Sequence, residues 1–186
     1  MPDVTHLHWT RLARAVPVLP LVLGITDGIL NALTLAGGAI LRSADGVSVS
    51  LALRVGCAAL ITAAFTMFIA DYAERRAQLV RASRQLNLTE PGRLATTRLG
   101  RQAARESAIA MLVAAVASLI GATAPLLVGE ALPGPSWLVL VLTVLALGLL
   151  GWILATILVA RRWRWAALMT IGGAAVAAIG VLLGIT

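Results

Sequence analysis

The chain has 186 residues, of which 60% are hydrophobic and only 12% are charged, and its mean hydropathy is +0.94. A soluble domain of this length would carry about a quarter charged residues, so the composition argues against a soluble globular protein and indicates one whose main solvent is lipid. The net charge of +7 comes from arginines that flank apolar stretches. We therefore expect anionic lipid headgroups, and not nucleic acid, as the partner of this charge.

Five apolar runs follow one another along the chain, each near or above the roughly 20 residues that a helix needs to cross the hydrocarbon core. Each run must be helical, because an isolated strand would leave its backbone groups unpaired in lipid. The sequence predicts an all-α bundle of five transmembrane helices, preceded by an interfacial segment (residues 1–15) that Trp9 anchors. The transmembrane domain spans 16–186, and its helices are expected at 16–41, 51–72, 107–127, 136–160 and 165–185.

The placement of the arginines predicts the orientation of the bundle. Two arginines precede the first run, eight lie between the second and third runs, and three lie between the fourth and fifth. The opposite side has only Arg42 and, just inside the second run, Arg54. Because arginine is concentrated on the cytoplasmic side of membrane proteins, we expect the N-terminus inside and the C-terminus outside. The compartment that we expect is a bacterial plasma membrane, crossed several times.

Asp27 lies near the middle of the first apolar run, where an ionisable group costs about 2.5–3.5 kcal/mol. Asn31 and Thr34 follow at helical spacing, so the three residues form one polar stripe. Gly24 and Gly28 flank the aspartate and would allow another backbone to approach closely. Two interpretations fit this pattern: a cation or proton pathway, or a structural hydrogen bond between helices.

The end of the second run places Met67, Asp71 and Glu74 along one helical face. A thioether and two carboxylates can bind a transition-metal ion such as Fe²⁺ or Mn²⁺, because sulfur disfavours calcium and magnesium. The alternative is that the two carboxylates pair with Arg75 or with other arginines nearby, while Met67 only packs.

Residues 73–106 are expected to form a basic, helical cytoplasmic connection. Its first part continues the second helix, residues 87–92 (NLTEPG) interrupt it, and a further helix then runs into the third span. That helix would carry Arg98, Arg101 and Arg105 on one face. The face suits a contact with anionic headgroups or a protein partner, but a solvated surface that only obeys the charge rule is the simpler interpretation.

The last three apolar runs carry no charge, and their glycines are typical of close helix packing. These glycines are Gly148, Gly151, Gly172, Gly173 and Gly180. The sequence contains no recognisable catalytic serine, cysteine–histidine pair, phosphate loop or zinc motif. Nothing therefore favours an enzyme, although a small membrane enzyme acting on a lipid-like substrate is one hypothesis beside the two given below.

Three segments of the chain resemble the vacuolar iron transporter family: residues 24–38 (GITDGILNALTLAGG), 67–72 (MFIADY) and 168–175 (LMTIGGAA). The resemblance implies a homodimer whose first helices line a pathway at the dimer interface. It also implies that Fe²⁺ or related divalent ions leave the cytosol in exchange for protons. Residue by residue, Asp27 corresponds to the central pathway aspartate and Met67 to the pathway methionine, with Asn31 as a neighbour.

The chain departs from that family at two acidic positions and in its inner connection. Members have an aspartate seven residues before the central one and a glutamate eight residues before the methionine, where this chain has Pro20 and Ala59. Their glutamate-rich metal-binding module is replaced here by the arginine-rich connection, which repels divalent cations. Two main hypotheses follow: a transporter of iron or manganese ions, or a scaffold or accessory subunit that kept the bundle without the ion route.

Overall fold

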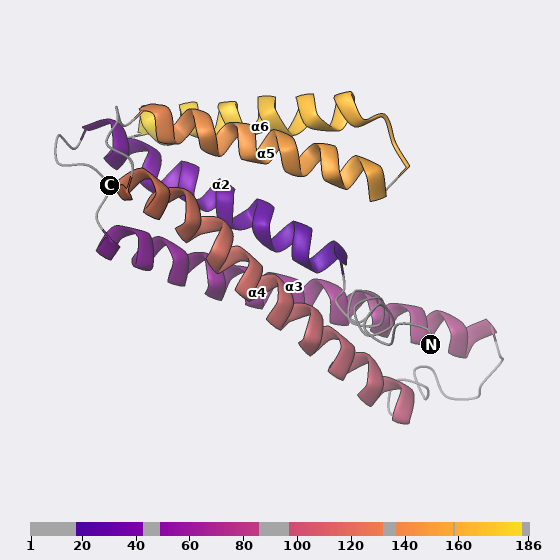
Figure 1. Cartoon of the computed structure of the whole chain (residues 1–186). Coiled ribbons are helices and arrows are strands. Elements are labelled where there is room, and N and C mark those ends of the chain that lie inside the picture. Colours follow the sequence, from indigo (N-terminus) through magenta and orange to yellow (C-terminus); the bar gives the residue numbers. More distant parts are fainter. Residues whose placement is uncertain (1–17, 43–48, 86–96, 132–136, 158, 184–186) are drawn as a thin grey trace, which may run out of the picture.

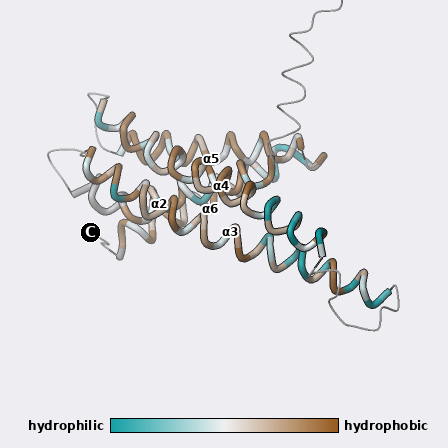
Figure 2. The backbone as a smooth tube through the Cα atoms, turned by 90° about the horizontal axis from the view of Figure 1, so that it is seen from below, coloured by the Kyte–Doolittle hydropathy of each residue, from teal (hydrophilic) through white to brown (hydrophobic). Residues whose placement is uncertain are grey.

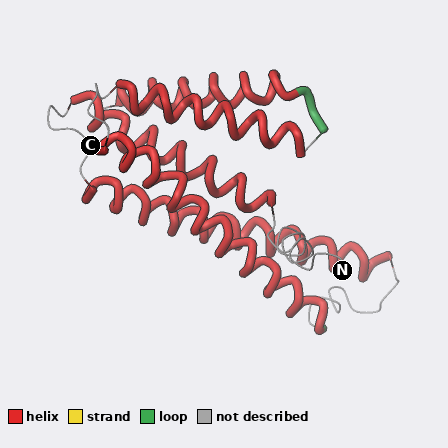
Figure 3. The backbone as a smooth tube through the Cα atoms, in the orientation of Figure 1, coloured by secondary structure: helices red, strands yellow, loops and turns green. Residues whose placement is uncertain are grey.

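The computed structural model describes residues 18–42, 49–85, 97–131, 137–157 and 159–183. These segments contain helices and no strand, and Figure 3 shows helix along nearly all of their length, with a short loop between the last two helices. Each helix is long and apolar enough to cross a membrane, so the predicted all-α bundle of five membrane helices is confirmed. The helices are α2 (Val18–Arg42), α3 (Val49–Gln85), α4 (Arg98–Ala131), α5 (Trp137–Ile157) and α6 (Arg162–Leu183).

Helix α2 occupies the centre of the bundle. It contacts each of the other four helices, whereas α3 makes no contact with α5 or α6 within the described residues. The paired helices α3 and α4 lie on one side of α2, and the hairpin of α5 and α6 lies on the other (Figure 1). A polar group on α2 is therefore surrounded by protein on several sides, which is the environment that a charged side chain in a membrane requires.

Helices α3 and α4 are longer than a membrane crossing needs. Their 37 and 34 residues correspond to about 55 and 50 Å at 1.5 Å per residue, against a hydrocarbon core of about 30 Å. The surplus projects beyond the bundle as a pair of helices, and Figure 2 shows hydrophilic residues gathered at this end. The basic connection at 73–106 thus consists largely of the continued α3 and the start of α4.

The helix ends agree with the predicted spans to within a few residues, with two informative exceptions. Helix α4 continues through Pro125 to Ala131, past the predicted end at residue 127. Helix α6 begins at Arg162, so Arg162 and Arg164, which were expected in the preceding turn, belong to its first turn, while Arg161 lies just before it. The interfacial segment 1–15 and the interruption at 87–92 lie outside the described residues.

Small residues allow α2 and α4 to cross with their backbones in contact. A Cβ atom added to Gly24 would lie 2.9 Å from the Cα of Ala114, and one added to Gly28 would lie 2.8 Å from the backbone nitrogen of Ala122. The predicted close approach at these two glycines is therefore confirmed, and the neighbour is α4 of the same chain. This crossing fixes the level at which Asp27 meets α4.

Four of the five glycines in α5 and α6 also lie in tight contacts. A Cβ atom on Gly180 would lie 2.8 Å from the carbonyl oxygen of Leu33, and one on Gly151 would lie 2.6 Å from that of Trp165. Gly148 and Gly173 are similarly crowded by Thr170 and Leu147. The prediction was wrong for Gly172 within this chain, because the residue is exposed and a Cβ atom there would meet nothing within 4 Å.

Candidate functional site

Asp27 is half-buried on α2 and is held by two neutral side chains. Asn31 donates a hydrogen bond from Nδ2 to Asp27 Oδ2 at 3.3 Å, and Ser118 of α4 lies with its Oγ 3.1 Å from the same oxygen. The Ser118 hydroxyl is also 3.2 Å from the carbonyl oxygen of Ala59, and its one proton serves only one of these acceptors at a time. Among the residues that the structure describes, no cationic side chain pairs with Asp27.

Asp27 and Met67 line the same groove between α2, α3 and α4. The groove has a volume of about 260 Å³ and opens on the side of the bundle, where Leu23 is 47% exposed. Its polar or polarisable side chains are those of Asp27, Thr66 and Met67, and the Thr66 hydroxyl donates to the Thr62 carbonyl at 2.8 Å. The remaining lining residues are Leu23, Gly24, Ala63, Ala70 and Ala114.

The predicted polar stripe of α2 is divided between two roles. Asn31 orients the carboxylate of Asp27 from one turn away. Thr34 instead donates to the backbone carbonyl of Leu30 at 3.0 Å. Its hydroxyl is thus bonded within α2 and makes no bond to Asp27. Only Asp27 itself reaches the groove among these three residues.

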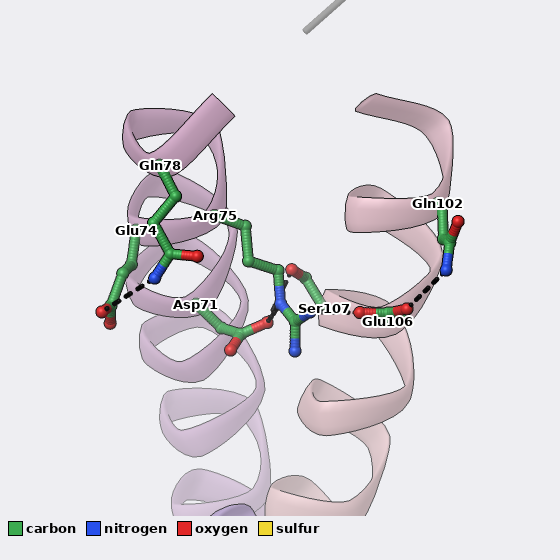
Figure 4. A network of polar contacts seen from close by, with 7 residues as sticks. All are labelled: Asp71, Glu74, Arg75, Gln78, Gln102, Glu106 and Ser107. Carbon is green, nitrogen blue, oxygen red and sulfur yellow. Dashed lines mark hydrogen bonds and ion pairs between the residues drawn. The ribbon is translucent and has the colours of Figure 1, made fainter. Parts of the chain in front are cut away.

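A second polar cluster lies where α3 and α4 leave the bundle (Figure 4). Arg75 Nε donates to Asp71 Oδ2 at 2.7 Å, and Ser107 Oγ donates to the same oxygen at 2.7 Å. The guanidinium also pairs through Nη1 with Glu106 Oε2. Asp71 thus has a cationic partner and a serine partner at once, and the cluster joins α3 to α4.

The structure separates the three residues that were predicted to share one metal-binding face. Met67 belongs to the groove, Asp71 belongs to the cluster with Arg75, and exposed Glu74 accepts a hydrogen bond from Gln78 at 3.4 Å. Within the described part of the chain, no group of three or more histidine, cysteine or acidic residues is placed to hold a metal ion. The alternative interpretation, pairing with an arginine, describes the contacts of Asp71 but not those of Glu74.

The three arginines at the start of α4 lie together as predicted. With Gln102, they line a hollow of about 480 Å³ on the surface of the helix. All of these side chains are exposed. The arginines form no ion pair with any residue in the described ranges. The residues of this hollow are Arg98, Arg101, Gln102 and Arg105.

The two positions at which the chain departs from the iron transporter pattern are both packed. Pro20 is buried near the start of α2, and Ala59 is 1% exposed in a core cluster with Ala122. Because the Cβ of Ala59 is enclosed by neighbouring helices, a glutamate at this position would require the core to open. At this position the chain therefore has a packed alanine where the family pattern has a second carboxylate.

Two residues of the site were not anticipated from the sequence. Ser118 supplies the interhelical contact to Asp27, and Thr66 adds a hydroxyl to the groove. Ser118 does have a recognisable setting, because it stands between Ala114 and Ala122 at the four-residue spacing that brings helices together. A lone hydroxyl at such a spacing in an apolar span is a signal for a contact with a polar group on the facing helix.

Comparison of the chain with protein-family models, with curated proteins and with solved structures finds no match. The resemblance to the vacuolar iron transporter family rests on the three short segments alone and stays a prediction. Any function of the chain must therefore be inferred from the chemistry of the groove and of its side chains.

Proposed function

We propose that this protein carries divalent transition-metal ions across the membrane, with Asp27 and Met67 as the binding residues. The observation that carries the proposal is a carboxylate in the membrane that shares a groove with a thioether and has no cationic partner among the described residues. A charge at this depth needs compensation. A cation arriving through the groove would supply it.

The chemistry of the two side chains favours first-row transition ions. Carboxylate oxygen accepts many cations, but the thioether of Met67 favours softer ions such as Fe²⁺ and disfavours Mg²⁺ and Ca²⁺. Mn²⁺ is the second candidate, bound mainly by the oxygen. Exchange against protons fits the same site, because the carboxyl group can be compensated either by the metal ion or by a proton.

A homodimer through α2 would complete the site, since one chain offers few ligands. Four helices of the same chain already contact α2, so a second copy has access chiefly to the edge at Leu23, where the groove opens. Two copies facing each other there would cover the groove and bring two sets of Asp27 and Met67 together. This arrangement agrees with what the family resemblance implies.

A flux assay on purified protein in liposomes tests the proposal. We expect entry of Fe²⁺ or Mn²⁺ that saturates with concentration and that Asp27→Asn abolishes, since the amide keeps the shape of the side chain but loses its charge. Glu130→Gln is the matched control, because it makes the same change at an exposed carboxylate on the last turn of α4 and should leave flux intact. Equal flux through the wild type and Asp27→Asn would refute the site.

The competing function, a non-transporting scaffold or accessory subunit, is favoured by the hydrogen bond between Asp27 and Ser118. That bond alone gives the aspartate a structural task in joining α2 to α4. The buried Pro20 and Ala59 also favour this function, because they stand where the iron transporter pattern has two further acidic residues. A well-folded protein without metal flux would favour this second function over transport, and in that case Asp27→Asn should lower stability instead of transport.

A further inference from the structure

The arginines at the start of α4 lie on the side of the helix that faces away from the protein. At 100° per residue, Arg98, Arg101 and Arg105 lie within a narrow arc. The buried residues Ala103 and Ser107 lie on the opposite side of the helix. The hollow between the arginines therefore opens outward, and no described residue of another helix lines it.

The same side of α4 continues toward the membrane as a stripe of exposed apolar residues. Leu112 follows Arg105 by two turns and is 59% exposed, and Val116 is 53% exposed one turn later. Ile109 and Ile120 flank this stripe and are also exposed. Inside a bilayer these side chains contact acyl chains, so one helix face carries cationic groups directly above a lipid-facing surface.

The start of α4 lies within reach of the lipid phosphates when the apolar part of the helix crosses the bilayer. Ser107 begins the apolar stretch of α4, and at 1.5 Å per residue the Cα atoms of Arg105 and Arg98 lie about 3 and 13 Å beyond it. The headgroup region extends roughly 5–8 Å outside the hydrocarbon core. Long arginine side chains bridge the remaining distance by snorkelling toward the interface.

The charge of this face is not neutralised within the described residues. Glu106 is the nearest acid in sequence, but it pairs with Arg75 and accepts a hydrogen bond from Gln102 at 3.0 Å. Arg75 thus pairs with two acids, while the three arginines of the hollow pair with none among the described residues. Three unpaired guanidinium groups suit the oxygens of a phosphate, which guanidinium binds through paired N–H donors.

We infer that this face is a binding site for an anionic phospholipid, whose phosphate occupies the hollow while an acyl chain lies along Leu112 and Val116. The inference is independent of metal transport and needs only that the bundle lies in a membrane. The lipid would hold the projecting start of α4 at a fixed depth, and it would neutralise part of the basic end of the bundle.

Lipid selectivity of the reconstituted full chain tests the site. Spin-labelled phosphatidylglycerol and phosphatidylcholine are compared in vesicles of phosphatidylcholine, and the ratio of their association constants is measured. We expect the wild type to prefer phosphatidylglycerol, and the combined changes Arg98→Gln, Arg101→Gln and Arg105→Gln to lower that preference by at least about fivefold, since each basic residue near the surface contributes about that factor. The matched control removes the same charge at the same end of the bundle, at Arg161, Arg162 and Arg164 around the start of α6.

The outcomes separate a built site from a general charge effect. Loss of preference in the α4 variant with retention in the control supports the site, as does a clearly weaker preference in a variant with lysine at all three positions of α4, because lysine keeps the charge but not the paired donors. Equal loss in both glutamine variants, or no loss in either, overturns it. Displacement of the labelled lipid by inorganic phosphate at matched ionic strength would assign the hollow to a soluble phosphate compound and would also overturn the lipid inference.

Discussion

Asp27 and Asp71 are two carboxylates at different levels of the bundle, and each is hydrogen-bonded to a serine of the facing helix α4. The serine is Ser118 for Asp27 and Ser107 for Asp71. The serines are eleven residues apart and therefore lie on the same side of α4, three turns from each other. The difference lies in the second partner: Asp71 has the guanidinium of Arg75 at 2.7 Å, and Asp27 has the neutral amide of Asn31 at 3.3 Å.

This difference separates a structural carboxylate from one that is available for function. The charge of Asp71 is balanced by a side chain of the same helix, so its cluster is complete within the protein. The charge of Asp27 has no such balance among the described residues and adjoins a groove. Both aspartates are partly buried and hydrogen-bonded, so the absence of a cationic partner among the described residues is what makes Asp27 the candidate for binding an ion.

Giving Asp27 an internal cation should abolish transport. In Met67→Arg the new guanidinium lies in the groove beside Asp27 and takes the place of the metal ion, so we expect metal flux in liposomes to fall to the background of empty vesicles. This is the largest effect that the comparison predicts. Met67→Leu is the control at the same position, because it keeps the volume, loses only the sulfur and should reduce flux without abolishing it.

The arginine variant must insert and purify as a single species for the result to count, because an arginine within a membrane helix costs about 2.5–3.5 kcal/mol before it finds a partner. Full flux through a well-folded Met67→Arg protein would show that the groove is not the ion route. The comparison between the two aspartates would then lose its functional meaning.

Removing Arg75, the cationic partner of Asp71, should leave the polar cluster between α3 and α4 in need of an external cation. Arg75→Gln leaves Asp71 and Glu106 close together without a positive charge between them, and we expect the free energy of unfolding to fall by about 1 kcal/mol, a value reduced for solvent screening at this partly exposed position. Thermal unfolding in detergent measures the change, and added Mg²⁺ or Mn²⁺ should recover part of it.

Arg76→Gln provides the control for that measurement. Arg76 is exposed and forms no ion pair with any residue in the described ranges, so the loss of one charge there should change stability by only a few tenths of a kcal/mol. A similar loss of stability in both variants would mean that net charge, and not the cluster, is responsible.

The sequence was sufficient for the bundle but only partly for the site. Hydropathy predicts each helix because length and apolarity alone decide whether a segment crosses lipid, and the position of Asp27 marks the level of the site. Met67 shares a helical face with Asp71, yet one lines the groove and the other contacts Arg75. Only the contacts between helices separate them, and these contacts depend on where backbones cross.

The serine partners of the two aspartates on α4 could not be predicted from the sequence either, because they too depend on where the helices cross. The register of α4 against α2 is fixed by Gly28, whose missing side chain admits the backbone near Ser118 and Ala122. A helical wheel reports which residues of one helix share a face, but it carries no information on the height at which two helices meet. The contacts of Ser118 and Ser107 with the two aspartates are therefore visible only in the packed structure.

The two serines offer the finest test of the comparison, because the same change can be made at both. Ser107→Ala and Ser118→Ala each remove one interhelical hydrogen bond, and we expect each to lower the free energy of unfolding by about 0.6 kcal/mol, the average for such bonds in membranes. Their effects on metal binding should differ. Ser118→Ala removes a donor from Asp27 Oδ2 and should shift the concentration of Fe²⁺ or Mn²⁺ that gives half-maximal flux, whereas Ser107→Ala acts on a carboxylate that Arg75 already neutralises and should leave that concentration unchanged. An equal shift in both variants would mean that the two aspartates serve the same purpose, and the distinction drawn from Arg75 would have to be abandoned.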